Sequence, residues 1–259
     1  MTYVVACFSG SKDSTAMVVG MIEKGEQLDE VLFCDVGMEF DALYRHVDKV
    51  KTYLDEKGVK FTVLKPSHPF TWYMYEKPVS SKKYGEFNGL GWPRSRMRWC
   101  TKFLKTKPMN DYVKKLQKEH GEVTVCVGLA HDEVKRLERV NNKYDRHPLD
   151  EWGWSEKTCL QYCKKHGYDW YDEEKGLYLY DIFDRLGCSI CPFQRIDTMR
   201  TLRRYYPELW YEIGDMEKKL GELRSQQIVQ FDERYRDRPW SYYEDRFTKE
   251  DEKSKGEEE

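Results

Sequence analysis

The stretch "YVVACFSGSKDSTAM", residues 3–17, decides the fold class of this chain. Its first six residues are mostly apolar and rich in β-branched side chains, a pattern that predicts a buried strand. The residues from Lys12 onward have helical spacing, and a short turn of serine and glycine separates the two elements. A strand that turns directly into a helix aims backbone N–H groups and the positive end of the helix dipole at one point. We therefore expect Ser9–Ser14 to hold an anion, with a phosphate group as the leading candidate.

Strands and helices alternate along the first 130 or so residues. We expect further strands at 29–37, 60–65 and 122–129, and helices at 12–25, 41–58 and about 101–119. Repeated β-α-β units predict an α/β fold, with a Rossmann-like parallel sheet and helices on both faces. Ligands of such a sheet bind at the carboxyl ends of its strands.

The composition changes beyond about residue 150, where tryptophan, tyrosine and charged residues become frequent. Helical spacing from about 195 to 232 predicts a helical C-terminal extension packed on the sheet domain. The expected organisation is a sheet domain at 1–150, a mainly helical, cysteine-containing extension at 151–248 and a charged tail at 249–259. The tail, "KEDEKSKGEEE", has no apolar residue, which predicts a solvated segment, with a partner contact as the alternative.

Composition limits the classes of function. Hydrophobic residues make up 39% of the 259 residues and charged residues 35%, as in a soluble globular protein. The net charge of −2 provides no global attraction to nucleic acid or to an anionic membrane. No apolar run is long enough to span a bilayer and no signal peptide is recognised, so we expect a cytoplasmic protein without a membrane partner. In that compartment the eight cysteines are better interpreted as core thiols and metal ligands than as disulfides.

The turn at Ser9–Ser14 has neither the G-x-x-x-x-G-K-[ST] nor the G-x-G-x-x-G spacing. Lys12 can neutralise phosphate charge, and the serine hydroxyls can donate hydrogen bonds without adding charge. Asp13 cannot usefully face a bare phosphate, so it either orients Lys12 and a Mg²⁺ ion or caps the helix. A structural Gly-Ser turn that merely caps the helix is the alternative interpretation of the segment.

Five segments together resemble a known family. Ser9–Ser14 resembles the S-G-G-x-D-S signature of the PP-loop ATP pyrophosphatase superfamily, with Ser11 in place of the second glycine. The segments "FCDVGMEFDALYRHVDKV", "RWCTKFLKTKPM", "VGLAHDEVKRLER" and "LGCSICPF" resemble, in order, those of its phosphoadenosine phosphosulfate (PAPS) reductase-like branch. The segment "VGLAHDEVKRLER" departs from the family pattern, with Ala130 in place of an arginine and Val134 in place of a serine. The resemblance covers residues 3–195.

The resemblance implies an adenine nucleotide alpha hydrolase-like fold, with residues 1–150 as a PP-loop nucleotide-binding domain. It implies nucleotide-binding roles for Ser9, Gly10, Ser11, Lys12, Asp13, Ser14, Asp35 and Gly128, and catalytic roles for Lys12, Asp13, Asp132 and Glu133. Asp35 and Glu39 would hold a ribose hydroxyl or a metal ion, although ordinary solvated carboxylates beyond a strand are the alternative. The implied cofactors are ATP and Mg²⁺.

A second anion site is predicted from basic residues. Arginine side chains present paired donors in a fixed plane, which suits phosphate, sulfate or a nucleic-acid backbone. The candidate substrate-binding residues are Arg94, Arg96, Arg98, Lys102, Arg136 and Arg139. A solvated charge run is the alternative for the residues around 94–102, and ion pairing along a helix is the alternative for Arg136 and Arg139.

The cysteines supply a candidate metal centre. Cys188 and Cys191 form a C-x-x-C turn, which provides half of a tetrahedral site. We expect Cys100, Cys163, Cys188 and Cys191 around one centre, with Cys159 as the substitute for Cys163. The centre would be a four-iron four-sulfur cluster or Zn²⁺, and the resemblance favours the cluster, although Thr101 stands where the cluster-binding reductases have a second cysteine. Three further cysteines lie within predicted strands and are interpreted as core thiols: Cys7, Cys34 and Cys126.

Three hypotheses of function follow. The leading one is an ATP-dependent enzyme that adenylates a substrate oxygen and lets sulfur displace AMP. A sulfonucleotide (PAPS or adenosine phosphosulfate) reductase or sulfotransferase-type enzyme is the second, although no cysteine follows Cys191 to accept a sulfonate. A non-catalytic nucleotide-binding component of a larger assembly is the third. The expected partners are an adenine nucleotide and a sulfur donor or redox partner, and nucleic acid and a homo-oligomer stay open.

Overall fold

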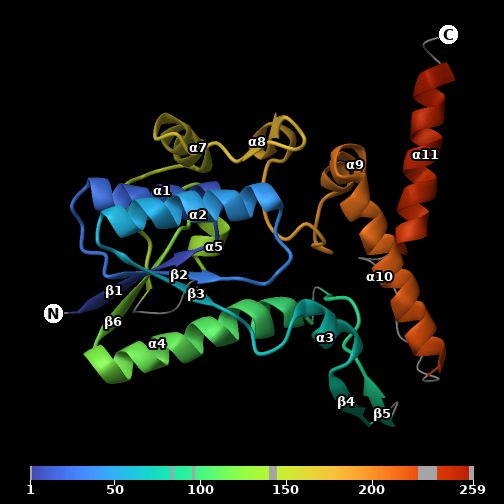
Figure 1. Cartoon of the computed structure of the whole chain (residues 1–259), viewed down its shortest axis with the longest axis horizontal. Helices are drawn as coiled ribbons and strands as arrows, with labels where there is room; N and C mark the ends of the chain where they lie inside the picture. The colour runs from blue at the N-terminus through green and yellow to red at the C-terminus, as the bar shows by residue number, and fades with distance from the viewer. Residues whose placement is uncertain (1, 83–84, 95–96, 140–144, 227–237, 257–259) are drawn as a thin grey trace. The chain divides into compact units, whose positions relative to one another are not determined.

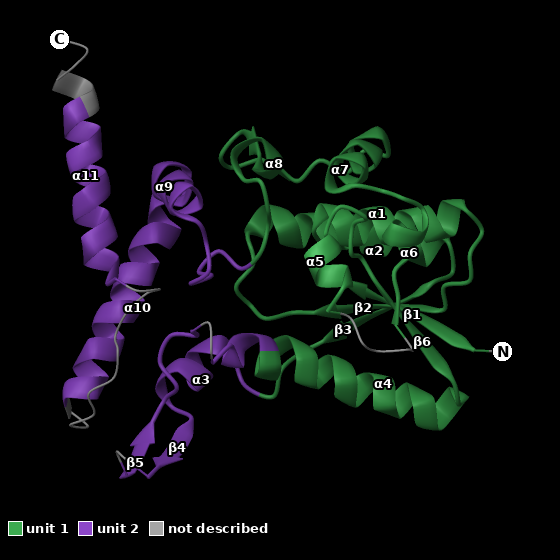
Figure 2. Ribbon diagram, turned by 180° about the vertical axis from the view of Figure 1, so that it is seen from behind, with its two compact units in different colours: residues 1–67, 102–187 green, residues 68–101, 188–259 purple. Residues whose placement is uncertain are grey.

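The computed structural model describes residues 2–82, 85–94, 97–139, 145–226 and 238–256. The chain divides into two compact units, coloured separately in Figure 2. Unit 1 comprises Met1–Ser67 and Lys102–Gly187, and unit 2 comprises His68–Thr101 and Cys188–Glu259. The boundary expected at residue 150 lies inside unit 1.

Unit 1 is built on a five-stranded parallel sheet in the order β3-β2-β1-β6-β7. Its strands are β1 (Tyr3–Phe8), β2 (Glu30–Cys34), β3 (Lys60–Leu64), β6 (Val123–Val127) and β7 (Asp145–Arg146). The chain builds outward from β1 to β3 and then places β6 on the other side of β1. The strand order therefore reverses between β1 and β6, the place where open α/β sheets bind their ligands.

Helices cover both faces of this sheet (Figure 1). The helices α1 (Lys12–Glu23) and α2 (Asp41–Glu56) lie on one face, and α4 (Lys107–His120) lies on the other. A π-helical turn, η1 (Thr101–Thr106), leads into α4. The predicted α/β fold with a parallel sheet and helices on both faces is confirmed.

Apolar side chains of three strands and of α4 form a common core beneath that helix. Val5, Leu32 and Leu64 come from three neighbouring strands and pack with Leu116 of α4. Period-2 side chains of a strand and period-3.6 side chains of a helix each produce one apolar face, and the two faces are buried together. This packing holds the carboxyl ends of the strands at one edge.

The remainder of unit 1 consists of short helices and one small hairpin. It consists of α5 (Val134–Leu137), α6 (Pro148–Glu151), α7 (Glu156–Lys165), the hairpin β8 (Tyr171–Asp172) and β9 (Leu177–Tyr178), and α8 (Leu179–Ile182). Helix α7 packs directly on α1. A segment more than 130 residues away in sequence therefore lies beside the helix that follows the predicted anion turn.

Unit 2 has its own core of aromatic and helical elements. It contains α3 (Phe70–Tyr75), the hairpin β4 (Pro78–Ser81) and β5 (Gly85–Asn88), α9 (Ile196–Tyr205), α10 (Pro207–Gln226) and α11 (Trp240–Gly256). Arg224 of α10 is 2% exposed and donates hydrogen bonds to the carbonyls of Asn88 and Gly89, at 2.8 Å each. One buried guanidinium thus joins α10 to the end of the hairpin.

The C-terminal charged segment, predicted to be solvated, is largely helical. Helix α11 continues to Gly256, so most of the expected tail is helical, and residues 257–259 lie outside the described part. In this part of the chain Glu250 bonds Arg246 and Arg200, and Asp251 bonds Arg203. The predicted helical C-terminal part is confirmed. Within the described residues, no helix is both long and apolar enough to cross a membrane.

Candidate active site

The predicted anion turn follows β1 directly, at the strand-order reversal. Gly10 adopts φ = +77°, and a Cβ atom there would lie 2.9 Å from Leu43 Cδ2. Glycine is therefore required at this position for two reasons, the left-handed backbone and the close approach to α2. The chain then enters α1 at Lys12.

Serine hydroxyls cluster at the start of α1. Ser9 Oγ lies 2.9 Å from Ser11 Oγ and 3.1 Å from Ser14 Oγ. Ser11 is the N-cap residue, but its side chain makes no capping hydrogen bond to the helix. The three hydroxyls are thus gathered beside the amino end of α1, and that of Ser11 is not used to cap the helix. The arrangement suits an anion that accepts these donors.

A cavity of about 580 Å³ opens beside this turn. Ser9, Ser11, Asp13 and Ser14 line one part of it. Apolar side chains from β1, β2, β6 and α4 line another part, among them Phe8, Phe33, Met109, Val113 and Val125. The volume falls within the range of small-molecule sites, and the polar and apolar walls suit a ligand with a charged end and an apolar ring.

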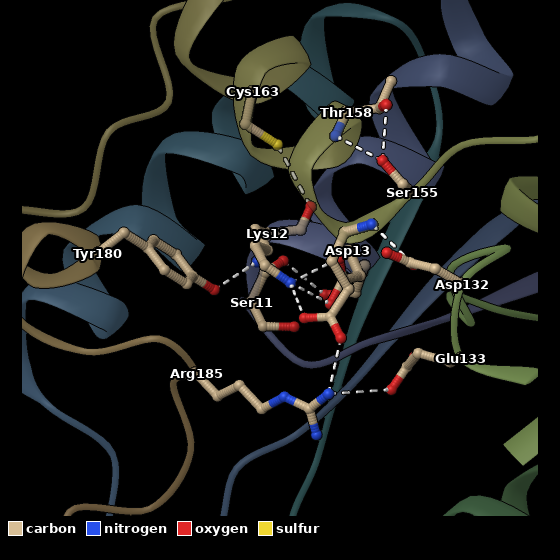
Figure 3. A network of polar contacts seen from close by, with 12 residues as sticks. Ser11, Lys12, Asp13, Asp132, Glu133, Ser155, Thr158, Cys163, Tyr180 and Arg185 are labelled. Atoms are coloured by element: carbon tan, nitrogen blue, oxygen red, sulfur yellow. Dashed lines mark hydrogen bonds and ion pairs between the residues drawn. The ribbon is translucent and has the colours of Figure 1, made fainter. Parts of the chain in front are cut away.

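In the described part of the chain, Lys12 is not one of the residues that line this cavity. Its Nζ atom lies 2.9 Å from both carboxylate oxygens of Asp13 and 2.8 Å from Glu156 Oε2 (Figure 3). Burial disfavours the ammonium, but the carboxylates of Asp13 and Glu156 outweigh it and raise the pKa of Lys12. The alternative in which Asp13 orients Lys12 therefore has direct geometric support, whereas Asp13 does not cap α1 with its side chain.

Further charges extend this contact toward the cavity. Arg185 bonds Glu156 at 2.6 Å and lies 3.8 Å from Glu133, which in turn bonds Arg136 at 2.6 Å. Glu133 is 9% exposed, and Arg136 lines the cavity. Glu133 and Arg136 thus form an ion pair three residues apart, which agrees with the alternative of ion pairing along a helix. Arg136 also lines the cavity.

Three side chains hold the backbone of the turn, and sequence reasoning missed Tyr180 and Trp170 and assigned Cys163 to a metal centre. Tyr180 accepts a hydrogen bond from the Lys12 N–H at 2.8 Å, and Cys163 Sγ donates to the Lys12 carbonyl at 3.3 Å. The indole of Trp170 donates to the Gly10 carbonyl at 2.7 Å. Trp170 has φ = 53°, a strained backbone for a bulky residue. Such strain persists where the surrounding contacts hold a residue in place.

The other predicted nucleotide-binding residues lie around the strand ends. Gly128 follows β6 and lines the cavity, and a Cβ there would lie 3.1 Å from Ser14 Cα. Asp35 follows β2 and accepts hydrogen bonds from the Gly37 N–H and the Tyr44 hydroxyl, so it closes a local turn. Glu39 lines the cavity and lies 3.4 Å from Lys105 Nζ. Asp132 accepts a hydrogen bond from the Glu156 N–H at 3.0 Å.

The predicted basic residues fall in different units. Lys102, Arg136 and Arg139 belong to unit 1, where Lys102 and Arg139 are exposed. Arg94 and Arg98 belong to unit 2, where the Arg98 guanidinium lies 4.7 Å from the ring centre of Phe193. Arg96 lies outside the described residues. A single anion-binding row from 94 to 98 stays a prediction.

None of the eight cysteines, all within the described residues, forms a disulfide. Cys100, Cys188 and Cys191 belong to unit 2 and are partly exposed, and the Cys191 N–H donates to the Cys188 carbonyl in a tight turn. Cys163 belongs to unit 1, where it is buried and its thiol donates a hydrogen bond to the Lys12 carbonyl. Within the described part of the chain, no three His, Cys, Asp or Glu side chains are grouped closely enough to hold a metal ion. The four-cysteine centre stays a prediction.

The three cysteines interpreted as core thiols lie in the central strands. Burial raises the pKa of Cys7 to about 12, that of Cys34 to about 11 and that of Cys126 to about 12. Such thiols are neutral at physiological pH, which agrees with the interpretation. Cys7 and Cys34 also contribute to the cavity wall.

Comparison with known proteins places the chain in a family. Two uncharacterized proteins of Methanocaldococcus jannaschii are similar to it. MJ0066 is 26% identical over 217 residues, which are 80% of this chain and 40% of that protein. MJ0973 is 26% identical over 223 residues, which are 83% of this chain and 47% of that protein. The chain therefore spans less than half the length of these curated relatives.

Among solved structures, the U34-tRNA thiolase NcsA from Methanococcus maripaludis, with its four-iron four-sulfur cluster, is similar at a TM-score of 0.42 and 13% identity. The match covers 89% of this chain and 74% of that one, and its level is too low to bear on function. The family model described as the phosphoadenosine phosphosulfate reductase domain matches residues 3–194, which include the anion turn, the cavity and the C-x-x-C turn. The chain belongs to the phosphoadenosine phosphosulfate reductase domain family.

Proposed function

We propose that the chain is a PP-loop enzyme that uses ATP to adenylate an oxygen of its substrate and then allows sulfur to displace AMP. The observation that carries the proposal is the cavity at the carboxyl ends of the parallel strands, with the serine-lined turn in one wall and apolar side chains in another. A nucleotide requires both kinds of wall, because its phosphates need donors and its base needs apolar contacts. Family membership supports the same class of ligand.

In the proposed first step, the substrate oxygen attacks the α-phosphorus of ATP. The bond between that phosphorus and the oxygen bridging to the β-phosphate breaks, and pyrophosphate leaves with the electron pair. Ser9, Ser11 and Ser14 would donate to the phosphates, and Arg136 would stabilise the charge that develops on pyrophosphate. Asp13, on the same wall, is the carboxylate that fits a magnesium ion carried by the nucleotide.

In the proposed second step, a sulfur nucleophile attacks the adenylated carbon and AMP leaves. Unit 2 would contribute Cys100, Cys188 and Cys191 to a four-iron four-sulfur or zinc centre, since thiols in a tight turn are the donors that either group prefers. Such a centre would bind and deliver sulfide. The fourth ligand expected from the sequence, Cys163 or Cys159, is buried in α7 of unit 1.

The family match favours a second candidate, a sulfonucleotide reductase or sulfotransferase-type enzyme acting on a phosphosulfate nucleotide. Its ligand has the same adenosine and phosphate groups, so the cavity suits both candidates.

One competition experiment separates them. The protein is purified without oxygen and titrated with ATP against PAPS, and the release of AMP and pyrophosphate is followed with Mg²⁺ present. Preference for ATP with release of pyrophosphate supports adenylation. Preference for PAPS without pyrophosphate release contradicts it and returns the protein to sulfonucleotide chemistry. If neither nucleotide binds, the cavity is not a nucleotide site and both candidates fail.

A further inference from the structure

Glu156 is held in place more firmly than a surface carboxylate. It is the first residue of α7, directly after the N-cap Ser155, whose hydroxyl accepts the Thr158 N–H at 3.2 Å. Its own N–H donates to Asp132 at 3.0 Å. Two side chains therefore fix the backbone on either side of the point from which the carboxylate extends.

The carboxylate of Glu156 bridges two cations. Oε2 lies 2.8 Å from Lys12 Nζ, and Oε1 lies 2.6 Å from an Arg185 nitrogen (Figure 3). Burial alone would raise the pKa of Glu156, but the two cations outweigh it and lower the pKa, so the group is ionised at neutral pH. The Lys12 side chain is 6% exposed, which makes Glu156 and Asp13 its immediate surroundings.

This contact decides where the Lys12 ammonium lies. The ammonium contacts two carboxylates and does not line the cavity, whereas its neighbour Asp13 does. We propose that Glu156 is a positioning residue of the anion turn: it holds the Lys12 ammonium against Asp13 and thereby fixes the Asp13 carboxylate at the cavity wall. The inference rests on the proposed function in one respect, that the cavity receives the phosphates of a nucleotide.

The proposal predicts opposite effects on affinity and on rate. Glu156→Gln removes one negative charge beside the turn and leaves Lys12 with a single carboxylate. An anion should then bind more tightly, by about three- to ten-fold for one charge at this range in a partly buried site. The rate at saturating nucleotide should fall about ten- to hundred-fold, because Lys12 and Asp13 lose their fixed arrangement. Loss of packing alone would instead weaken binding.

The test compares Glu156→Gln with a matched control, Asp181→Asn. Asp181 also pairs with a lysine, Lys164 at 3.3 Å, but it lies on α8, and within the described residues this ion pair does not involve the turn. The dissociation constants of ATP and of PAPS, the rate of AMP formation and the melting temperature are measured for both variants and the wild type. Glu156→Asp restores the charge but shortens the side chain by one methylene, so it should return the affinity to the wild-type value and recover only part of the rate.

Tighter binding with a slower rate in Glu156→Gln, and neither effect in Asp181→Asn, supports the proposal. Equal affinities in the two variants overturn it, as does a loss of affinity that follows the melting temperature. Because the affinities are measured for both nucleotides, they test the role of Glu156 even if the wild type releases no pyrophosphate. Absence of pyrophosphate release from the wild type refutes adenylation by itself.

Discussion

Acidification should destabilise unit 1 through a single buried histidine, His46 of α2. Its side chain is packed beneath the anion turn, with Nε2 at 2.9 Å from Thr15 Oγ1 and its ring centre 4.3 Å from that of Trp170. Burial, with a smaller contribution from Lys49, lowers the pKa of His46 to about 3. The folded state therefore keeps this imidazole neutral at a pH where the unfolded chain protonates it.

The magnitude follows from proton linkage. The unfolded chain binds the proton with an ordinary pKa of 6.5, and the folded chain with a pKa of about 3. Because the folded pKa is the lower one, stability is complete above the unfolded value and is lost as the pH falls below it. Between about pH 7 and about pH 5 the loss from this one group is about 2 kcal/mol.

The assay is urea unfolding followed by tryptophan fluorescence across that pH range. Wild-type protein is compared with His46→Gln and with His166→Gln, a change at an exposed histidine of the same unit. His46→Gln should be less stable at neutral pH but should lose about 2 kcal/mol less than the wild type on acidification, because it lacks the imidazole that binds a proton when the chain unfolds. His166→Gln should follow the wild type. Equal losses in wild type and His46→Gln would refute the reasoning.

Four further outcomes are expected. Gly10→Ala forces a side chain into a left-handed backbone and should cost about 1–3 kcal/mol of stability and most nucleotide affinity, measured by urea melts and by titration. Trp170→Phe leaves a buried carbonyl without its donor and should cost about 1–3 kcal/mol, with weaker nucleotide binding measured by the same titration. Arg224→Met removes two buried hydrogen bonds and should destabilise unit 2 by about 2–4 kcal/mol, seen in hydrogen exchange of its amides. Cys188→Ser should abolish bound iron or zinc in anaerobically purified protein, whereas Cys126→Ser should retain it; equal metal content would contradict the predicted centre.

Much of unit 1 was predictable from local sequence. The apolar run of β1, the helical spacing after Lys12 and the repetition of this pattern determine the strands, the helices and their parallel arrangement. Each of these features depends on residues that are close together in the sequence, so the spacing of apolar residues predicts it. The requirement for glycine at position 10 was also visible, because few other residues turn a strand so abruptly into a helix.

The division into two units was not predictable in the same way. Unit 2 joins residues 68–101 to residues from 188 onward, so the composition change near 150 does not mark its boundary. The helical conformation of the charged C-terminal segment was not predictable for a related reason. Its ion pairs with α9 join residues nearly 50 apart, and no local pattern reports such a pairing.

The contacts that shape the candidate site belong to tertiary structure alone. Glu156, Trp170 and Tyr180 reach the anion turn from 144 to 168 residues away in the chain. The sequence by itself determined that a strand, a turn and a helix would present donors to an anion. Only the folded chain decided that the Lys12 ammonium is held by two carboxylates, because the packing of α7 on α1 sets which charges meet.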